Sequence, residues 1–285
     1  MIGDPGPELK RQIAHARGAA RSFPARSAMA NHRIHVSDLA LHAGHPTVRV
    51  TGDEAHHAVR VKRLESGDPV TLLDGRGRML SGPITSIDKD RQTGEWTLTI
   101  DGGGGVQLQP RPTHPVLVFA PAPKGDRLAE MIDGLSQVGA SAWHHLQTER
   151  TVTDPRPTKV DRLERIAFEA MKQCGRAWML ELGESCELAR IPLGPATIVA
   201  DDTGGSLSDL PLPAEGPVRL LVGPEGGFSP GELERLRRGG CGIARLGPHI
   251  LRIETAAIVG AARVHAAREG QSAPSAGTTS GSKLS

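Results

Sequence analysis

The sequence contains few aromatic residues and few cysteines, and each shortage argues against a class of function. Phe, Trp and Tyr together make up 2% of the chain, and Tyr is absent. Proteins that read single-stranded RNA on a sheet stack bases on aromatic side chains, so this mode of binding is not expected. The cysteines Cys174, Cys186 and Cys241 are odd in number and lack the spacing of metal ligands. This pattern predicts neither disulfides nor a metal site and indicates a reduced, cytoplasmic setting.

Excess charge and long apolar runs are also missing. The formal net charge is only +2 at pH 7, so any affinity for nucleic acid has to come from a local basic surface. No apolar stretch approaches the length that crosses a membrane. With 285 residues, the chain is long enough for one large domain or two ordinary ones.

The two ends differ in composition from the middle of the chain. Residues 1–30 hold more basic than acidic residues, together with Pro and Gly, which predicts a disordered basic extension. An RNA-binding arm, a transit-like leader and a true translation start at Met29 are the alternatives for this segment. Residues 269–285 are rich in Gly, Ser and Thr without periodicity, which predicts a disordered tail.

Residues 31–110 have the pattern of a small β-rich domain. The expected strands are short and bounded by turn residues, namely 33–36, 47–50, 70–73, 79–80, 84–87 and 96–100. Asp74-Gly75 predicts a hairpin turn. Thr51 and Glu54 have the spacing of a capping box ahead of a helix over 56–64. On this helix His56, Arg60 and Arg63 share one side, a candidate RNA surface whose alternative is a simply solvated face.

Residues 113–200 alternate between strand-like and helix-like segments. Val116–Ala120 reads as a buried strand, and Asp126 is placed to cap the helix that follows it. A second helix pattern ends at Cys174-Gly175, and Ile198–Ala200 is the next strand, followed by a loop. This alternation favours a mainly parallel sheet.

Residues 218–256 contain two strands that each end in a glycine-bearing loop. Val218–Val222 leads into Gly223-Pro224-Glu225-Gly226-Gly227, and Ile243–Leu246 leads into a loop that begins at Gly247. Between them, Ser229, Pro230 and Glu232 have the pattern of a helix N-cap, first helical position and capping-box acid. Open α/β sheets bind ligands where strands end, so the paired loops predict a site. No phosphate-loop lysine or G-x-G-x-x-G spacing is present, which argues against a nucleotide phosphate.

The two loop segments, GPEGGFSPGELE and LGPHILRIETA, resemble the signature segments of SPOUT-superfamily methyltransferases that modify N3 of a uridine in 16S ribosomal RNA. Lys124-Gly125-Asp126-Arg127 and Gln173-Cys174-Gly175-Arg176 also resemble that family. The resemblance implies an α/β fold in which a trefoil-knotted SPOUT methyltransferase domain over 113–268 follows a PUA-like β-barrel RNA-binding domain over 31–110. The knotted domain should have a mostly parallel sheet with helices on both faces, and it is a known exception to unknotted topology.

The resemblance further implies S-adenosylmethionine as cofactor, 16S rRNA or the small ribosomal subunit as partner, and a homodimer. The implied cofactor-binding residues are Val222, Gly223, Pro224, Glu225, Gly226, Gly227, Leu246, Gly247, Ile250, Leu251, Arg252, Glu254, Thr255 and Ala256. The candidate RNA-binding residues are Arg33, His56, Arg60, Arg63, Lys124, Arg127 and Arg150.

Uridine N3 attacks a methyl group only after losing its proton, so a cation that stabilises the anionic ring lowers the barrier. Arg176 and Arg252 are the candidate cations, and Glu225 is a candidate for contacting the cofactor or the base. For each arginine the competing interpretation is an ordinary ion pair. Methylation of another RNA position or of a ribose 2′-OH remains open, as does a noncatalytic RNA-binding protein of ribosome assembly.

Overall fold

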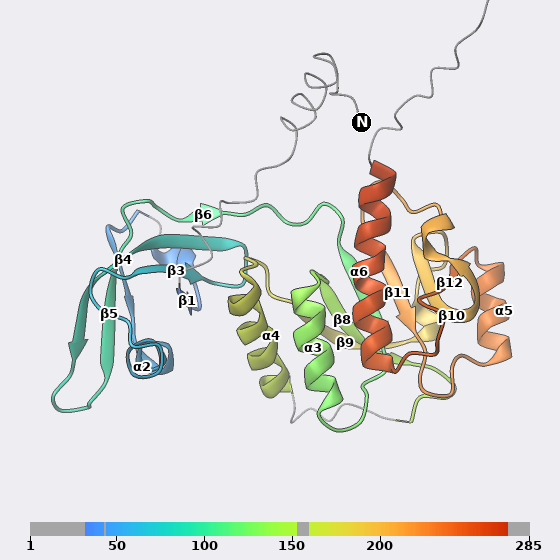
Figure 1. Cartoon of the computed structure of the whole chain (residues 1–285), viewed down its shortest axis with the longest axis horizontal. Helices are drawn as coiled ribbons and strands as arrows, with labels where there is room; N and C mark the ends of the chain where they lie inside the picture. The colour runs from blue at the N-terminus through green and yellow to red at the C-terminus, as the bar shows by residue number, and fades with distance from the viewer. Residues whose placement is uncertain (1–31, 43, 153–159, 273–285) are drawn as a thin grey trace, which may run out of the picture. The chain divides into compact units, whose positions relative to one another are not determined.

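A computed structural model describes residues 32–42, 44–152 and 160–272, which form two six-stranded sheets (Figure 1). The predicted N-terminal extension and residues 273–285 of the predicted tail lie outside the described residues. Residues 269–272 were predicted to be disordered, but they form the last turn of helix α6 (Ile253–Ser272).

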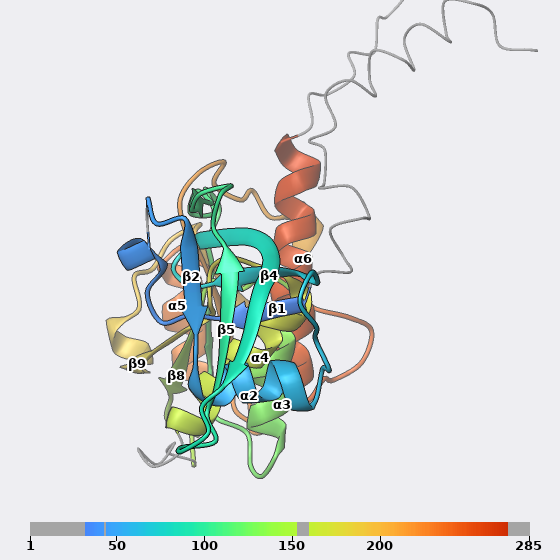
Figure 2. The same ribbon diagram turned by 90° about the vertical axis from the view of Figure 1, so that its left-hand side faces the viewer.

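The first sheet has the strand order β1-β3-β4-β5-β2, with β6 paired to β4. Its elements are β1 (His32–His35), η2 (Leu39–His42), β2 (Thr47–Val50), α2 (Gly52–Arg60), β3 (Pro69–Leu73), β4 (Arg78–Lys89), β5 (Trp96–Asp101) and β6 (Gln107–Leu108). Figure 2 shows β2, β5 and β4 side by side. The hairpin at Asp74-Gly75 is confirmed by the register Leu73↔Met79.

Strand β4 is longer than the sequence pattern indicated. Residues 79–80 and 84–87 were predicted as separate strands, but both lie in this one strand of 12 residues. Its first half pairs with β3, and a register shift between Ile84 and Ser86 turns its second half along β5. A bulge of this kind bends a strand, so one strand serves both parts of the sheet.

Helix α2 differs from its prediction at both ends. Thr51 lies at the N-cap, but its side chain makes no capping hydrogen bond. The Glu54 carboxylate instead accepts the His35 backbone N–H at 3.1 Å and pairs with Lys172 Nζ at 2.7 Å. These two partners occupy the acid that a capping box requires.

The helix ends at Arg60, so the predicted basic face does not continue to Arg63. The Leu64 N–H donates to the carbonyl of Ala58 at 3.1 Å, and Arg63 adopts a left-handed φ of 56°. The chain therefore turns back on the end of the helix, with arginine in a left-handed conformation that glycine usually adopts. The turn buries Leu64, which is 5% exposed, and thereby removes Arg63 from the helical face.

The second sheet is parallel at every described pairing and has the order β12-β10-β11-β7-β8-β9. Its strands are β7 (Val116–Ala120), β8 (Ala142–Gln147), β9 (Glu181–Glu187), β10 (Thr197–Ser206), β11 (Val218–Val222) and β12 (Gly242–Arg245). The helices are α3 (Arg127–Gln137), α4 (Val160–Cys174), α5 (Pro230–Arg238) and α6, with the short helices η4 (Leu188–Arg190) and η5 (Leu207–Asp209).

Helices cover both faces of this sheet, as predicted (Figure 1). Along β11, Leu220 faces the core cluster that holds residues of α3, α4 and α6. Its neighbour Leu221 faces a second cluster, which includes Leu236 of α5 and Leu188 of η4. This alternation is the period of a strand that is buried on both sides.

Two local predictions in this region were wrong. The segment after Ala200 was predicted as a loop, but β10 continues to Ser206 through a register shift between Ala200 and Gly205. Asp126 lies at the N-cap of α3 without a capping hydrogen bond. Its carboxylate pairs with Arg162 of α4 at 3.2 Å, which removes it from the helix terminus.

Candidate functional site

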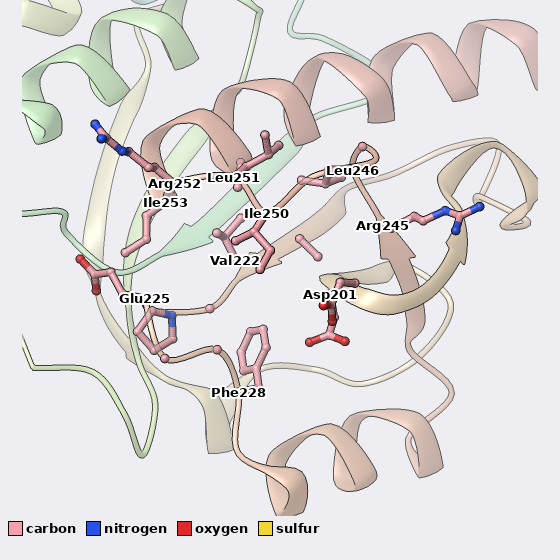
Figure 3. A pocket seen from close by; sticks show the side chains of 18 of the residues that line it. Asp201, Val222, Glu225, Phe228, Arg245, Leu246, Ile250, Leu251, Arg252 and Ile253 are labelled. Atoms are coloured by element: carbon pink, nitrogen blue, oxygen red, sulfur yellow. The ribbon is translucent and has the colours of Figure 1, made fainter.

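A cavity of about 540 Å³ lies where β11 and β12 end, beside the register shift in β10, and both glycine-bearing loops line it (Figure 3). This volume is within the range of about 300–1,000 Å³ that is usual for small-molecule sites. The sequence therefore correctly predicted that the two loops share one cavity.

The first loop is a tight turn that only glycine can form at one of its positions. The Gly227 N–H donates to the Pro224 carbonyl at 2.8 Å, and Gly227 has a φ of +66°. A Cβ atom added to Gly223 would lie 3.2 Å from the Phe228 ring, closer than ordinary van der Waals contact. Glycine at these positions thus lets the backbone form the cavity wall.

The predicted capping box that follows this loop is confirmed. The Glu232 N–H donates to Ser229 Oγ at 3.2 Å, and the Ser229 N–H donates to Glu232 Oε2 at 2.7 Å. Both residues are buried, so the bonds are shielded from water and hold the start of α5 beside the loop. Pro230 occupies the first helical position, as predicted.

The second loop is fixed at its two ends by α6. Arg263 donates to the Leu246 carbonyl at 2.6 Å, and the Ala256 N–H donates to the Arg252 carbonyl at 2.7 Å. Between these ends Ile250 is 91% exposed, although it is apolar and lines the cavity. An exposed apolar side chain at a cavity mouth is suited to cover a ligand.

Twelve of the predicted cofactor-binding residues line the cavity, and two do not. The lining set includes Val222, Gly223, Pro224, Glu225, Gly226, Gly227, Leu246, Gly247, Ile250, Leu251, Arg252 and Ala256. Thr255 is exposed outside it. Glu254 is buried, lies 4.0 Å from Arg127 and leaves its Oε2 without a hydrogen bond among the described residues.

The cavity has further walls that the cofactor assignment missed. They are formed by Arg127, Ala200, Asp201, Asp202, Phe228, Arg245, His249 and Ile253. Figure 3 shows Asp201 and Arg245 on one side and Glu225 and Arg252 on the other, with Leu246 and Ile250 between them. Asp201 and Asp202 follow the predicted strand Ile198–Ala200, and parallel strands bind ligands at one edge of the sheet. This position in the sequence could have been used to assign both residues to the cavity.

The two candidate cations lie in different surroundings. Arg252 is exposed at the rim of the cavity, where Figure 3 shows its guanidinium pointing away from the apolar side chains. Arg176 lies outside the cavity and donates to the carbonyls of Ser136 and Ala140 at 3.0 and 2.8 Å. Burial lowers the pKa of Arg176. In this chain Arg176 therefore supports the end of α3, and only Arg252 reaches the cavity.

The candidate RNA-binding residues do not form one surface in the described structure. His56, Arg60 and Lys124 are exposed, as is Arg63 beyond the end of α2. Arg127 lines the cavity and Arg150 binds the first glycine loop. Arg33 donates to the carbonyls of Lys172 and Gln173 at 2.9 and 3.1 Å, so it tethers β1 to α4.

Within residues 32–42, 44–152 and 160–272, no group of three His, Cys, Asp or Glu side chains is arranged to hold a metal ion. In the same ranges, no helix has the length and apolar character that crossing a membrane requires.

Comparison with known proteins identifies the family. A model described as RNA methyltransferase domain matches residues 109–265, and one described as RNA methyltransferase PUA domain matches residues 50–93. Ribosomal RNA small subunit methyltransferase E of Synechocystis is 31% identical over 78% of this chain and 74% of its own length.

Two solved structures share the fold. A probable rRNA-methyltransferase from Porphyromonas gingivalis is 26% identical with a TM-score of 0.69, covering 84% of this chain and 99% of its own. A Legionella pneumophila protein described as a methyltransferase, solved with bound S-adenosylmethionine, is 25% identical with a TM-score of 0.67, covering 83% and 98%. The chain therefore belongs to the ribosomal RNA small subunit methyltransferase E family, with a PUA-like domain ahead of an α/β methyltransferase domain.

Proposed function

We propose that this protein methylates N3 of a uridine in 16S ribosomal RNA with S-adenosylmethionine as methyl donor. The observation that carries the proposal is that the two signature loops of the family line one cavity at the ends of the parallel strands β11 and β12. A relative named ribosomal RNA small subunit methyltransferase E matches 78% of the chain.

The cavity suits S-adenosylmethionine in both chemistry and size. Its middle is apolar, with Val222, Leu246 and Leu251 available to pack against the adenine ring. Glycine backbone at Gly223 and Gly247 allows N–H and C=O groups to contact the ring edge without obstruction by a side chain. Charged side chains at both sides of the cavity offer partners for the polar groups of the cofactor. When bound, this cofactor supplies an electrophilic methyl group.

The chain's own residues supply orientation and charge. Arg252 at the cavity rim is placed to stabilise a uracil ring that carries negative charge after loss of the N3 proton. Glu225 lies on the same side and is available to the cofactor or the base. Holding the base in line with the methyl group supplies a further part of the rate enhancement.

We extend the proposal to the substrate and the assembly. Exposed His56 and Arg60 on α2 would contact RNA phosphates of the small ribosomal subunit, as would the exposed Lys124 in the methyltransferase domain. Two copies would pair as a homodimer, the arrangement expected of this superfamily. Substrate and cofactor place the activity in the cytoplasm. Residues 31–110 and 113–268 are the domains that we assign to RNA binding and catalysis.

The test is methyl transfer in vitro. Purified protein is incubated with S-adenosylmethionine carrying a labelled methyl group and with unmodified small subunits, and the digested RNA is analysed by mass spectrometry. The proposal predicts labelled 3-methyluridine. A labelled 2′-O-methylnucleoside or another labelled base would reassign the target. Cofactor binding without any transfer to RNA would contradict the proposed activity.

A further inference from the structure

We infer that Arg150 is a positioning residue for the cofactor loop 223–228, and not a contact for RNA. This inference rests on the proposed function, because it assumes that the loop binds S-adenosylmethionine. Arg150 follows β8, and its guanidinium donates to the carbonyl of Gly226 at 2.6 Å and to that of Phe228 at 3.4 Å. Gly226 and Phe228 line the cavity, whereas Arg150 does not. The guanidinium therefore acts on the cavity through the loop.

The aliphatic part of Arg150 lies on the side of Gly226 where a side chain would point. A Cβ atom built on Gly226 would lie 3.5 Å from Cδ of Arg150 and 3.9 Å from its Cβ, which is ordinary van der Waals contact. The stem thus lies along the loop backbone while the head holds its carbonyls. An arginine that is engaged in this way has fewer donors left for a phosphate.

Arg150 is presented from a turn that is itself fixed. The Thr148 N–H donates to Thr151 Oγ1 at 3.0 Å, and the Thr151 N–H donates to the Thr148 carbonyl at 3.2 Å. The Glu149 N–H donates to Glu232 Oε1 at 2.9 Å, and the other oxygen of Glu232 belongs to the capping box of α5. Glu149 and Arg150 therefore join the turn 148–151 to both ends of the segment 226–232.

The loop needs such support because its own sequence is flexible. Gly226 and Gly227 are adjacent, and glycine loses more backbone freedom on ordering than any other residue. Within the turn, the Gly227 N–H bonds to the Pro224 carbonyl, but that bond does not fix the Gly226 and Phe228 carbonyls. Arg150 holds these two carbonyls, which orients the peptide groups that form the cavity wall.

The experiment compares Arg150→Ala and Arg150→Lys with the wild-type chain. Arg190→Ala serves as a matched control, because Arg190 is exposed and pairs only with Glu187 across 3.7 Å among the described contacts. Calorimetry measures the Kd for S-adenosylmethionine without RNA, and fluorescence anisotropy measures affinity for a 16S rRNA fragment over a salt series. For each variant we would also measure the melting temperature, and the kcat and KM with S-adenosylmethionine and RNA varied in turn.

We expect Arg150→Ala to weaken cofactor binding by about 10-fold, the effect of losing one charge-assisted hydrogen bond. KM for S-adenosylmethionine should rise, while kcat at saturating cofactor and KM for RNA stay near wild type. Arg150→Lys should restore part of the cofactor affinity, because the ammonium is also a charged nitrogen donor but has a shorter reach than the guanidinium nitrogen that bonds both carbonyls. Arg190→Ala should behave as wild type.

Two results would overturn the inference while leaving the proposed function intact. One is unchanged cofactor Kd in Arg150→Ala. The other is reduced RNA affinity with a salt slope lower by about 1, which is the signature of a lost phosphate contact. If Arg150→Ala is unstable, Arg150→Lys decides alone, since a wild-type cofactor Kd in that variant contradicts the dependence of cofactor binding on the Arg150 guanidinium. A wild-type chain that binds no S-adenosylmethionine would overturn the proposed function and this inference together.

Discussion

Helices α2 and α5 begin with the same kind of sequence but are held in different ways. In α5, Ser229 and Glu232 bond to each other's backbone and close a capping box beside the cofactor loop. In α2, the equivalent Thr51 makes no capping bond, and Glu54 binds Lys172 of α4 and the backbone of β1. A sequence with the spacing of a capping box therefore forms that box only when its glutamate is not bound by a stronger partner elsewhere in the fold. Lys172 is such a partner, because its side chain is 9% exposed and a buried ammonium needs an opposite charge.

The two regions also differ in how they would serve the reaction. The loops beside α5 line a cavity that would hold the reacting groups, whereas α2 offers exposed basic side chains away from it. A group at the cavity would act directly on the charge that develops in the transition state, while the basic side chains of α2 would act on RNA through an interaction that salt screens. Loss of a group from the first region should therefore cost far more activity than loss from the second.

The largest expected effect comes from the cavity rim. Arg252→Ala should leave the melting temperature unchanged and lower kcat by about 100-fold or more, because the anionic uracil loses its cation. Steady-state assays with methyl-labelled cofactor measure the change. The exposed Arg245, on the opposite side of the cavity, is the control site, and Arg245→Ala should retain more turnover. Full activity in Arg252→Ala would contradict its assigned role.

A smaller effect is expected on α2. Arg60→Ala should weaken RNA binding a few-fold and reduce its salt slope by about 1, with cofactor affinity and kcat unchanged. Anisotropy over a salt series gives both quantities. Arg63→Ala tests whether Arg63 contributes to the same RNA affinity as Arg60, although it lies beyond the end of α2 with a φ of 56°. Identical RNA binding by wild type and Arg60→Ala would remove α2 from the RNA surface.

The helix starts can be compared directly through stability. Ser229→Ala should lower the free energy of unfolding by about 1 kcal/mol, the usual effect of losing an N-cap. Thr51→Ala should change it by less than about 0.5 kcal/mol, because its hydroxyl makes no capping bond. Urea denaturation monitored by circular dichroism measures both variants. Equal losses would show that α2 forms the capping box in solution.

The smallest effect concerns pH. Burial lowers the pKa of His265 in α6 below its ordinary value. The folded chain then binds this proton less readily than the unfolded chain, so the stability contribution is complete above about pH 6.5 and is lost as the pH falls below it. His265→Asn should flatten the dependence of melting temperature on pH below 6.5. An unchanged slope in His265→Asn would show that the side chain titrates normally.

The sequence was informative where the partners of a residue are close to it in the chain. The turn at Asp74-Gly75, the capping box at Ser229 and the end of α4 at Cys174 each depend on contacts within a few residues, and all were predicted. The position of the two glycine loops after neighbouring strands predicted that they share one site. The cavity walls at Asp201 and Arg245 escaped assignment, because β10 continues past Asp201 and Arg245 is the last residue of β12.

What could not be predicted depends on partners far along the chain. Glu54 pairs with a lysine 118 residues away, Arg150 with a carbonyl 76 residues away, and Arg176 with carbonyls of α3. Each of these side chains was assigned from its local pattern or its family position as a cap, an RNA contact or a catalytic cation. Arg150 and Arg176 donate hydrogen bonds to backbone carbonyls that lie far away in the sequence. Such carbonyls need hydrogen-bond partners in the folded chain, and the local sequence does not show which side chain will supply them.

The central claim is that the loops 223–227 and 247–252 present a methyl group to N3 of a uridine. The most direct measurement is mass mapping of methylated uridine in 16S rRNA from cells that lack the gene, complemented with the wild-type chain or with Arg252→Ala. The account predicts that one 3-methyluridine disappears on deletion, returns with the wild-type chain and stays absent with Arg252→Ala. An unchanged set of methylated uridines in the deletion strain would contradict it.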